Sequence, residues 1–135
     1  MMTSSVTKAA MWFGVVLLAV GVLGFVPGIT SNGLLLGIFE VDLLHNLVHV
    51  VTGAVAIWAS RAGMSASRNF FKVFGVVYAL VTVLGFVTGM GLAVAIPVNM
   101  ADNLLHVVIA AVALYLGFGT KGGSNMTMPS PGQPM

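Results

Sequence analysis

Four long stretches of this chain consist almost entirely of apolar residues, and they determine the solvent in which it can fold. They span residues 9–26, 41–60, 70–87 and 98–117. A helix that crosses a bilayer needs about 20 mainly apolar residues. Charged residues make up only 6% of the 135 residues, whereas soluble domains carry about 25%. The sequence therefore predicts an all-α polytopic membrane protein, with one four-transmembrane-helix bundle over residues 8–118.

The two ends of the chain differ from this apolar body. Residues 1–7 are predicted to form a short polar tip on the cytoplasmic side. Residues 119–135 combine Gly, Ser, Pro, Gln and Met, a composition too polar and too rich in proline to pack. We therefore expect a disordered cytoplasmic tail after the bundle.

The few charged residues are distributed asymmetrically. With four crossings, the acidic residues Glu40, Asp42 and Asp102 fall on one side of the membrane. All five cations fall on the other side: Lys8, Arg61, Arg68, Lys72 and Lys121. Because cytoplasmic loops carry an excess of Lys and Arg, we expect a multi-pass plasma-membrane protein with both termini cytoplasmic. The cations are too few, and too close to the spans, to predict nucleic-acid binding. The expected partner is the lipid bilayer, and a homo-oligomer or a larger membrane complex is left open.

Turn and capping residues set the expected ends of these helices. Asp42 is expected to cap the second helix, and Asn99 with Asp102 resembles a capping arrangement at the start of the fourth. Gly24 and Gly85 stand near helix ends, where a turn-forming role is expected. Residues 29–40 are expected to form an outer loop that turns at residues 31–33, and residues 60–69 a cytoplasmic loop.

The chain also resembles itself. A shift of 61 places residues 13–28 on residues 74–89 with eleven of sixteen identical, and a shift of 57 places 45–58 on 102–115 with eight of fourteen identical. We interpret this as two repeated helical hairpins, about residues 8–60 and 69–118. Two copies with the same orientation are related by an axis along the membrane normal. This relation predicts that His49 and His106 lie at the same depth.

Polar residues form a stripe on the second and fourth helices, close to the outer side. They recur at steps of three and four residues, so each set lies on one helix face. Lipid cannot satisfy their hydrogen-bonding groups, so both stripes are predicted to face the bundle interior. The candidate site residues are His45, Asn46, His49, Asp102, Asn103 and His106.

Three interpretations of this stripe compete. The default is a buried hydrogen-bond network that fixes helix register, in a structural protein or an accessory membrane subunit. The second is haem or another tetrapyrrole, with His49 and His106 as axial ligands and Asn46, Asn103 or Asp102 orienting the rings. The third is a divalent metal bound by His45 and His49, at i and i+4, with His106 or Asp102. No nucleophile–base–acid arrangement and no phosphate loop is present, so no catalytic residue is assigned and no enzyme is indicated.

Several segments resemble one known family. They are the Gly-Phe ending of the first helix, Phe39–His49 with Gly53, the Gly75–Tyr78 start of the third helix, and Pro97–His106. Together these segments resemble the domain of unknown function 4383, over about residues 8–117. The resemblance implies a small bacterial membrane protein with four spans. It implies no activity.

Overall fold

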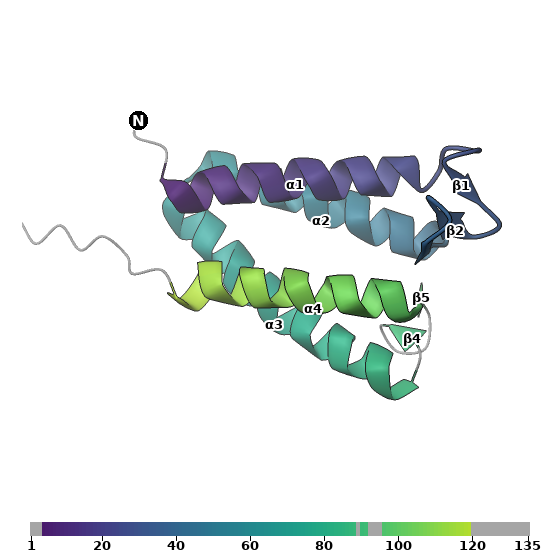
Figure 1. Cartoon of the computed structure of the whole chain (residues 1–135). Helices are drawn as coiled ribbons and strands as arrows, with labels where there is room; N and C mark the ends of the chain where they lie inside the picture. The colour runs from purple at the N-terminus through teal and green to yellow at the C-terminus, as the bar shows by residue number, and fades with distance from the viewer. Residues whose placement is uncertain (1–3, 89, 92–95, 120–135) are drawn as a thin grey trace, which may run out of the picture.

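The structure, a computed structural model, describes residues 4–88, 90–91 and 96–119. Within these residues, four helical segments are long and apolar enough to cross a membrane, which confirms the predicted four-span bundle. They are α1 (Ser5–Leu23), α2 (Leu43–Ala62), α3 (Met64–Thr88) and α4 (Met100–Leu114), the last continued by the π-helix η2 (Tyr115–Gly119). The four segments lie side by side, and the start of α1 lies at the same end of the bundle as η2 (Figure 1).

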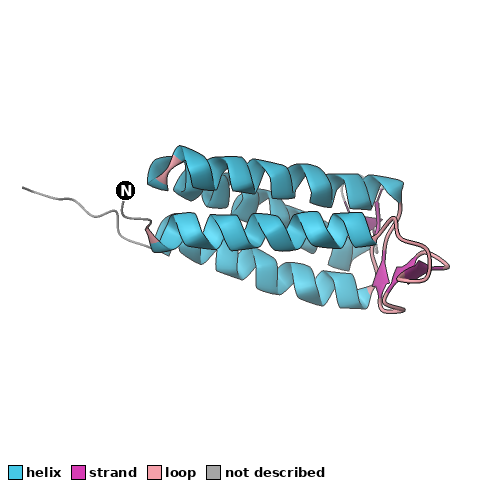
Figure 2. Ribbon diagram, turned by 90° about the horizontal axis from the view of Figure 1, so that it is seen from above, coloured by secondary structure: helices cyan, strands magenta, loops and turns pink. Residues whose placement is uncertain are grey.

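Short strands cover the opposite end of the bundle (Figure 2). Three of them, β1 (Thr30–Ser31), β2 (Leu34–Leu35) and β3 (Phe39–Glu40), form an antiparallel meander, and β4 (Met90–Gly91) pairs with β5 (Ile96–Pro97). The expected turn is present, because Asn32 and Gly33 have φ angles of 53° and 75°. The meander itself was not predicted, since strands of two residues leave almost no periodic pattern in a sequence.

The first helix begins earlier than predicted. Ser4 caps α1 by accepting a hydrogen bond from the Thr7 amide at 3.2 Å, and Val6 and Thr7 are buried. A serine cap satisfies one of the free amides at a helix start, so the helix includes residues that we had assigned to the polar tip. The predicted tail at residues 120–135 lies outside the described residues.

The predicted loop at residues 60–69 is wrong. α2 continues to Ala62 and α3 begins at Met64, so only Gly63 joins the two helices. Gly63 has φ +114°, a conformation that side chains disfavour, and glycine alone therefore makes the joint. Ser67, read as a loop residue, is fully buried and donates its hydroxyl hydrogen bond to the Ala59 carbonyl at 3.1 Å.

Glycines bring the two helices of each hairpin into backbone contact. A Cβ on Gly14 of α1 would lie 2.7 Å from the Gly53 carbonyl oxygen of α2. In the second hairpin, a Cβ on Gly75 of α3 would lie 2.9 Å from the Leu114 amide nitrogen of α4. Small residues permit this close approach, which supplies packing energy where hydrophobic exclusion is absent. α1 accordingly packs mainly against α2, and α3 against α4.

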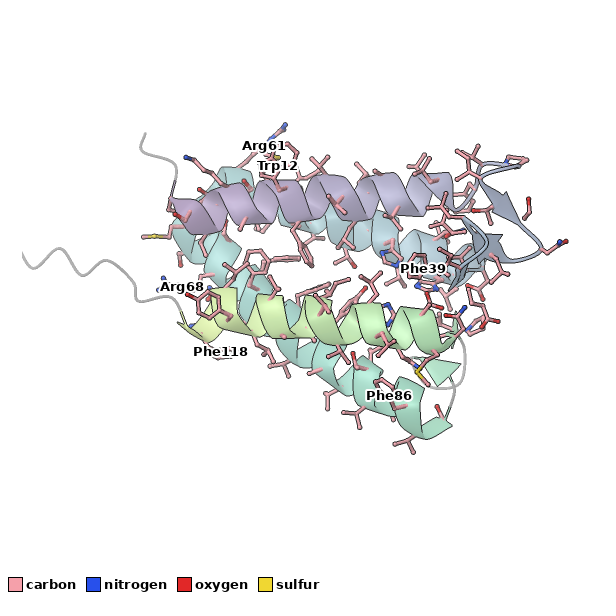
Figure 3. All side chains as sticks on the ribbon, in the orientation of Figure 1. Trp12, Phe39, Arg61, Arg68, Phe86 and Phe118 are labelled. Atoms are coloured by element: carbon pink, nitrogen blue, oxygen red, sulfur yellow. The ribbon has the colours of Figure 1, made fainter. Side chains whose placement is uncertain are left out.

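The bundle interior divides into an apolar half and a polar half. Away from the strands, Phe13 of α1 contacts Phe71 and Phe74 of α3 edge-on, with ring centroids 5.5 and 4.9 Å apart. Arg61 and Arg68 lie near this end of the bundle, away from the strands (Figure 3). Toward the strands the buried positions of α2 and α4 are instead His, Asn and Asp.

Enlarging Gly53 will destabilise the fold more than enlarging its neighbour. A Cβ there would lie 2.6 Å from the Leu18 amide nitrogen, a backbone atom that cannot move alone. We expect Gly53→Val to lower the free energy of unfolding by about 1–3 kcal/mol, as overpacking does. Ala54→Val, at an exposed position of the same helix, is the matched control. Thermal unfolding in detergent micelles measures both, and equal losses would contradict the close packing.

Candidate functional site

Six polar side chains lie inside the bundle in the half that faces the strands. They occupy the first two turns of α2 and α4, and none is more than 6% exposed. The prediction that the polar stripe faces the interior is therefore confirmed for His45, Asn46, His49, Asp102, Asn103 and His106. Lipid contacts are left to the apolar residues between them, such as Leu47 and Leu104.

Helix caps fix where each polar turn begins. The Asp42 carboxylate accepts a hydrogen bond from the His45 amide at 2.7 Å, which makes Asp42 the N-cap of α2 as predicted. At α4, the Asn99 side chain accepts from the Asp102 amide at 3.0 Å and the Asp102 carboxylate accepts from the Asn99 amide at 2.9 Å. This reciprocal pair is a capping box, so the expected capping arrangement is also confirmed.

Three imidazoles from two helices converge in this polar half. His45 and His49 stack along one face of α2 with ring centroids 4.9 Å apart, and His106 of α4 lies 6.0 Å from His45. One ring nitrogen from each histidine can be chosen so that all three lie within 4.8 Å of one another. The sequence placed His45 beside His49 by helical spacing and named His106 as a further ligand, and the fold brings the three rings together.

The Nδ1 atoms of these three histidines are buried and have no hydrogen-bond partner among the described residues. A buried polar group without a partner costs about 1–3 kcal/mol. A completed hydrogen-bond network would have satisfied these atoms. The default structural interpretation therefore accounts for the burial of the rings but leaves three nitrogens unexplained.

Asp102 has a different role from the three imidazoles. Its Oδ2 atom accepts the Glu40 amide at 3.0 Å as well as the Asn99 amide. Asn99 also donates its side-chain amide to the Ile38 carbonyl at 2.7 Å. Both bonds cross from α4 to the loop of the other hairpin, so Asp102 and Asn99 tie the two hairpins together at this end. The group of converging ligand atoms is formed by the histidines without Asp102.

The two asparagines pack against glycines rather than orienting the histidines. The Asn46 side chain lies directly against Gly24, and the Asn103 side chain against Gly85. A Cβ at either glycine would collide with the amide. Gly85 lies inside α3 rather than at a turn, so its expected turn-forming role is wrong. Neither asparagine bonds to a histidine Nδ1 in the part of the chain that the structure describes.

This geometry favours a single ion over a macrocycle. A haem ligated by His49 and His106 must lie between them and extend outward in its own plane. A third imidazole nitrogen, from His45, also lies within 4.8 Å of both candidate axial nitrogens. A tetrahedral ion has no such requirement, since three imidazoles around one point are its natural ligand set.

Sequence reasoning missed one neighbour of the cluster. Tyr78 of α3 stacks on Phe74 at 4.1 Å and meets His106 edge-on at 5.4 Å. It thereby connects the aromatic core to the histidines. The sequence did contain a signal for this residue, namely a tyrosine in the middle of an apolar span, where an unpaired hydroxyl is costly.

The comparisons with known proteins identify a family without an activity. A family model described as domain of unknown function (DUF4383) matches residues 8–119. This match confirms the resemblance found in the sequence. No match was found among curated proteins or among solved structures.

Removing the Asp102 carboxylate will loosen the tie between the hairpins. Asp102→Ala leaves the Glu40 and Asn99 amides without their acceptor, and we expect it to lower the free energy of unfolding by about 1–3 kcal/mol. Asp102→Asn keeps one acceptor oxygen and is expected to lose less. Leu104→Ala, two residues away and facing outward, is the control. Denaturant unfolding in micelles measures all three, and an unchanged Asp102→Ala protein would contradict this role.

Proposed function

We propose that this chain, which belongs to the DUF4383 family, is a membrane protein that binds a divalent transition-metal ion, zinc being the type case. The ligands are His45, His49 and His106, near the outer face of the plasma membrane. The observation that carries the proposal is the convergence of three buried imidazoles whose Nδ1 atoms have no partner among the described residues.

The distances between the candidate nitrogens support a metal site. Zinc binds histidine nitrogen at about 2.0–2.1 Å, so the nitrogens of a tetrahedral site lie roughly 3.3 Å apart. The three nitrogens here lie within 4.8 Å of one another. Binding of an ion therefore requires these nitrogens to draw together by up to about 1.5 Å. Imidazole ligands suit zinc, copper, iron and nickel better than magnesium or calcium.

The charges around the cluster also favour a cation. Three neutral imidazoles leave the ion's two positive charges uncompensated, and the nearest formal charges are negative. All three acidic residues of the chain stand at this end of the helices: Glu40, Asp42 and Asp102. Three protein ligands leave a fourth position open, as in zinc sites that bind a water or an exogenous group.

We further propose that the two hairpins are copies of one unit. Gly24 against Asn46 in the first hairpin corresponds to Gly85 against Asn103 in the second, under the same shifts of 61 and 57 that align the sequence. Residue identities and packing partners thus repeat together, which supports duplication. Assembly into a homo-oligomer or a larger membrane complex stays a prediction.

Metal uptake will depend on each of the three histidines. We expect the purified wild-type protein to bind one equivalent of zinc, and His45→Ala, His49→Ala and His106→Ala to lose it. Asn46→Ala, in the same buried turn of α2, should retain the ion. Zinc per protein and the visible absorption of the cobalt-loaded protein are the measurements. A folded wild-type protein that takes up neither ion would contradict the proposal.

The orientation is testable because the chain contains no cysteine. Arg61 and Arg68, at the end opposite the strands, support a cytoplasmic position for that end. In intact cells, a membrane-impermeant maleimide should label Ser31→Cys in the meander and leave Ser65→Cys unlabelled. Both positions are exposed in the protein, so permeabilised cells should label both. The reverse pattern in intact cells would overturn the orientation.

A further inference from the structure

A cavity of about 610 Å³ lies between the two hairpins, along α2 and α3. It follows from the packing described above, since glycines bring α1 to α2 and α3 to α4 while α2 packs only sparsely on α3. The two helices meet at Gly63 and diverge toward the end that carries the strands (Figure 1). The cavity volume falls in the range of about 300–1,000 Å³ typical of small-molecule sites.

The walls of this groove are apolar over most of its length. Valines at steps of three and four residues line it from both sides: Val48, Val51 and Val55 on α2, and Val73, Val77 and Val81 on α3. Short β-branched side chains leave a continuous channel between the helices. From His45 to Ala59 the groove follows fifteen residues of α2, a rise of roughly 21 Å. This shape fits an extended apolar chain.

One end of the groove is polar. His45 and His106 line it near the strands, each 5% exposed and each with an Nδ1 atom that has no hydrogen-bond partner among the described residues. The Tyr78 ring lies beside them, 5.4 Å from His106. A ligand whose tail lies along the valines would therefore present its head to two imidazoles and a phenol ring.

The charges at this end select among lipid heads. By their positions in the sequence, all the cations of the chain fall at the other end of the helices. The acidic residues fall at the same end as His45 and His106. In the ion-free protein, a phosphate or carboxylate head would meet negative charge with no counter-ion. A neutral head with carbonyl oxygens can accept hydrogen bonds from the imidazoles instead, and a planar ring can pack among the aromatic side chains.

We propose that the groove between α2 and α3 binds a neutral quinone-type lipid. Its carbonyl-bearing ring lies against His45, Tyr78 and His106, and its apolar tail runs along the valines toward Trp58, at the other end of the groove. The groove and the metal site share His45 and His106, so the quinone is proposed for the ion-free protein; His49 does not line the groove and belongs to the metal site alone.

Trp58 provides the readout for the test. The chain has two tryptophans, and Trp12→Phe leaves Trp58 as the single fluorophore. The probe is a decyl-substituted benzoquinone with bromine at the tail terminus, titrated into the full-length protein in lipid nanodiscs. We expect saturable quenching beyond that of the unbrominated quinone, because the bromine reaches Trp58.

Matched variants locate the site. Val77→Phe fills the groove and should weaken binding at least about tenfold, whereas Val76→Phe, equally exposed but outside the groove, should change it less than about twofold. His45→Ala should weaken binding by about tenfold, the equivalent of one well-placed hydrogen bond. His49→Ala should lose zinc but bind the quinone as the wild type does.

Three outcomes would overturn the proposal. The first is quenching that rises linearly with probe concentration, and the second is an equal loss of quinone binding in Val77→Phe and Val76→Phe. The third is displacement of the probe by excess phosphatidylcholine, which would identify an ordinary bilayer lipid as the occupant. If every histidine variant loses zinc while His49→Ala still binds the quinone normally, both proposals are supported. Failure of zinc uptake alone would remove only the metal site.

Discussion

Close backbone contact inside each hairpin is the constraint on which the rest of this structure depends. In a bilayer, lipid tails are as apolar as the side chains, so helices associate through packing and hydrogen bonds rather than through exclusion from water. Gly14 against Gly53, and Gly75 against Leu114, bring the helices of each hairpin together at backbone distance. The contact between the hairpins is correspondingly sparse. That difference creates the groove between α2 and α3, and it also leaves room for imidazoles from α2 and α4 to meet.

The polar end of the bundle holds the hairpins together where their packing is sparse. Asp102 and Asn99 bond at 3.0 and 2.7 Å to the backbone of the loop between α1 and α2, which belongs to the other hairpin. Charge-assisted bonds to backbone amides are among the stronger ones available to a protein. These bonds orient the first turn of α4 and thereby direct His106 toward His45. The cap of α2 does the same for His45 itself, since Asp42 binds its amide.

Sequence reasoning reached the parts of the fold that are local or periodic. The length of the apolar stretches predicted four membrane spans, and helical spacing predicted that the histidines and asparagines face the interior. Capping preferences predicted that Asp42 and Asn99 stand at the starts of α2 and α4. It failed where the answer depends on two distant segments. Ser67 was predicted to lie in a loop, whereas its hydroxyl in fact donates a hydrogen bond to the Ala59 carbonyl of the preceding helix. Gly85 resembled a turn until the Asn103 side chain was found against it. Neither contact leaves a trace in local spacing.

The position of the third histidine follows the same logic. Under the shift that aligns α2 with α4, His49 corresponds to His106, but His45 corresponds to Asp102. A symmetric pair of hairpins would present either two further imidazoles or two carboxylates at this level. Instead, the first hairpin contributes a third ring to the cluster, and the second contributes the carboxylate that holds the loop between α1 and α2. The bundle interior thus brings three imidazoles together because the two hairpins differ at this position. The difference lets His45 join the other two imidazoles while Asp102 bonds to the loop of the other hairpin, two roles that a single side chain could not fill at once.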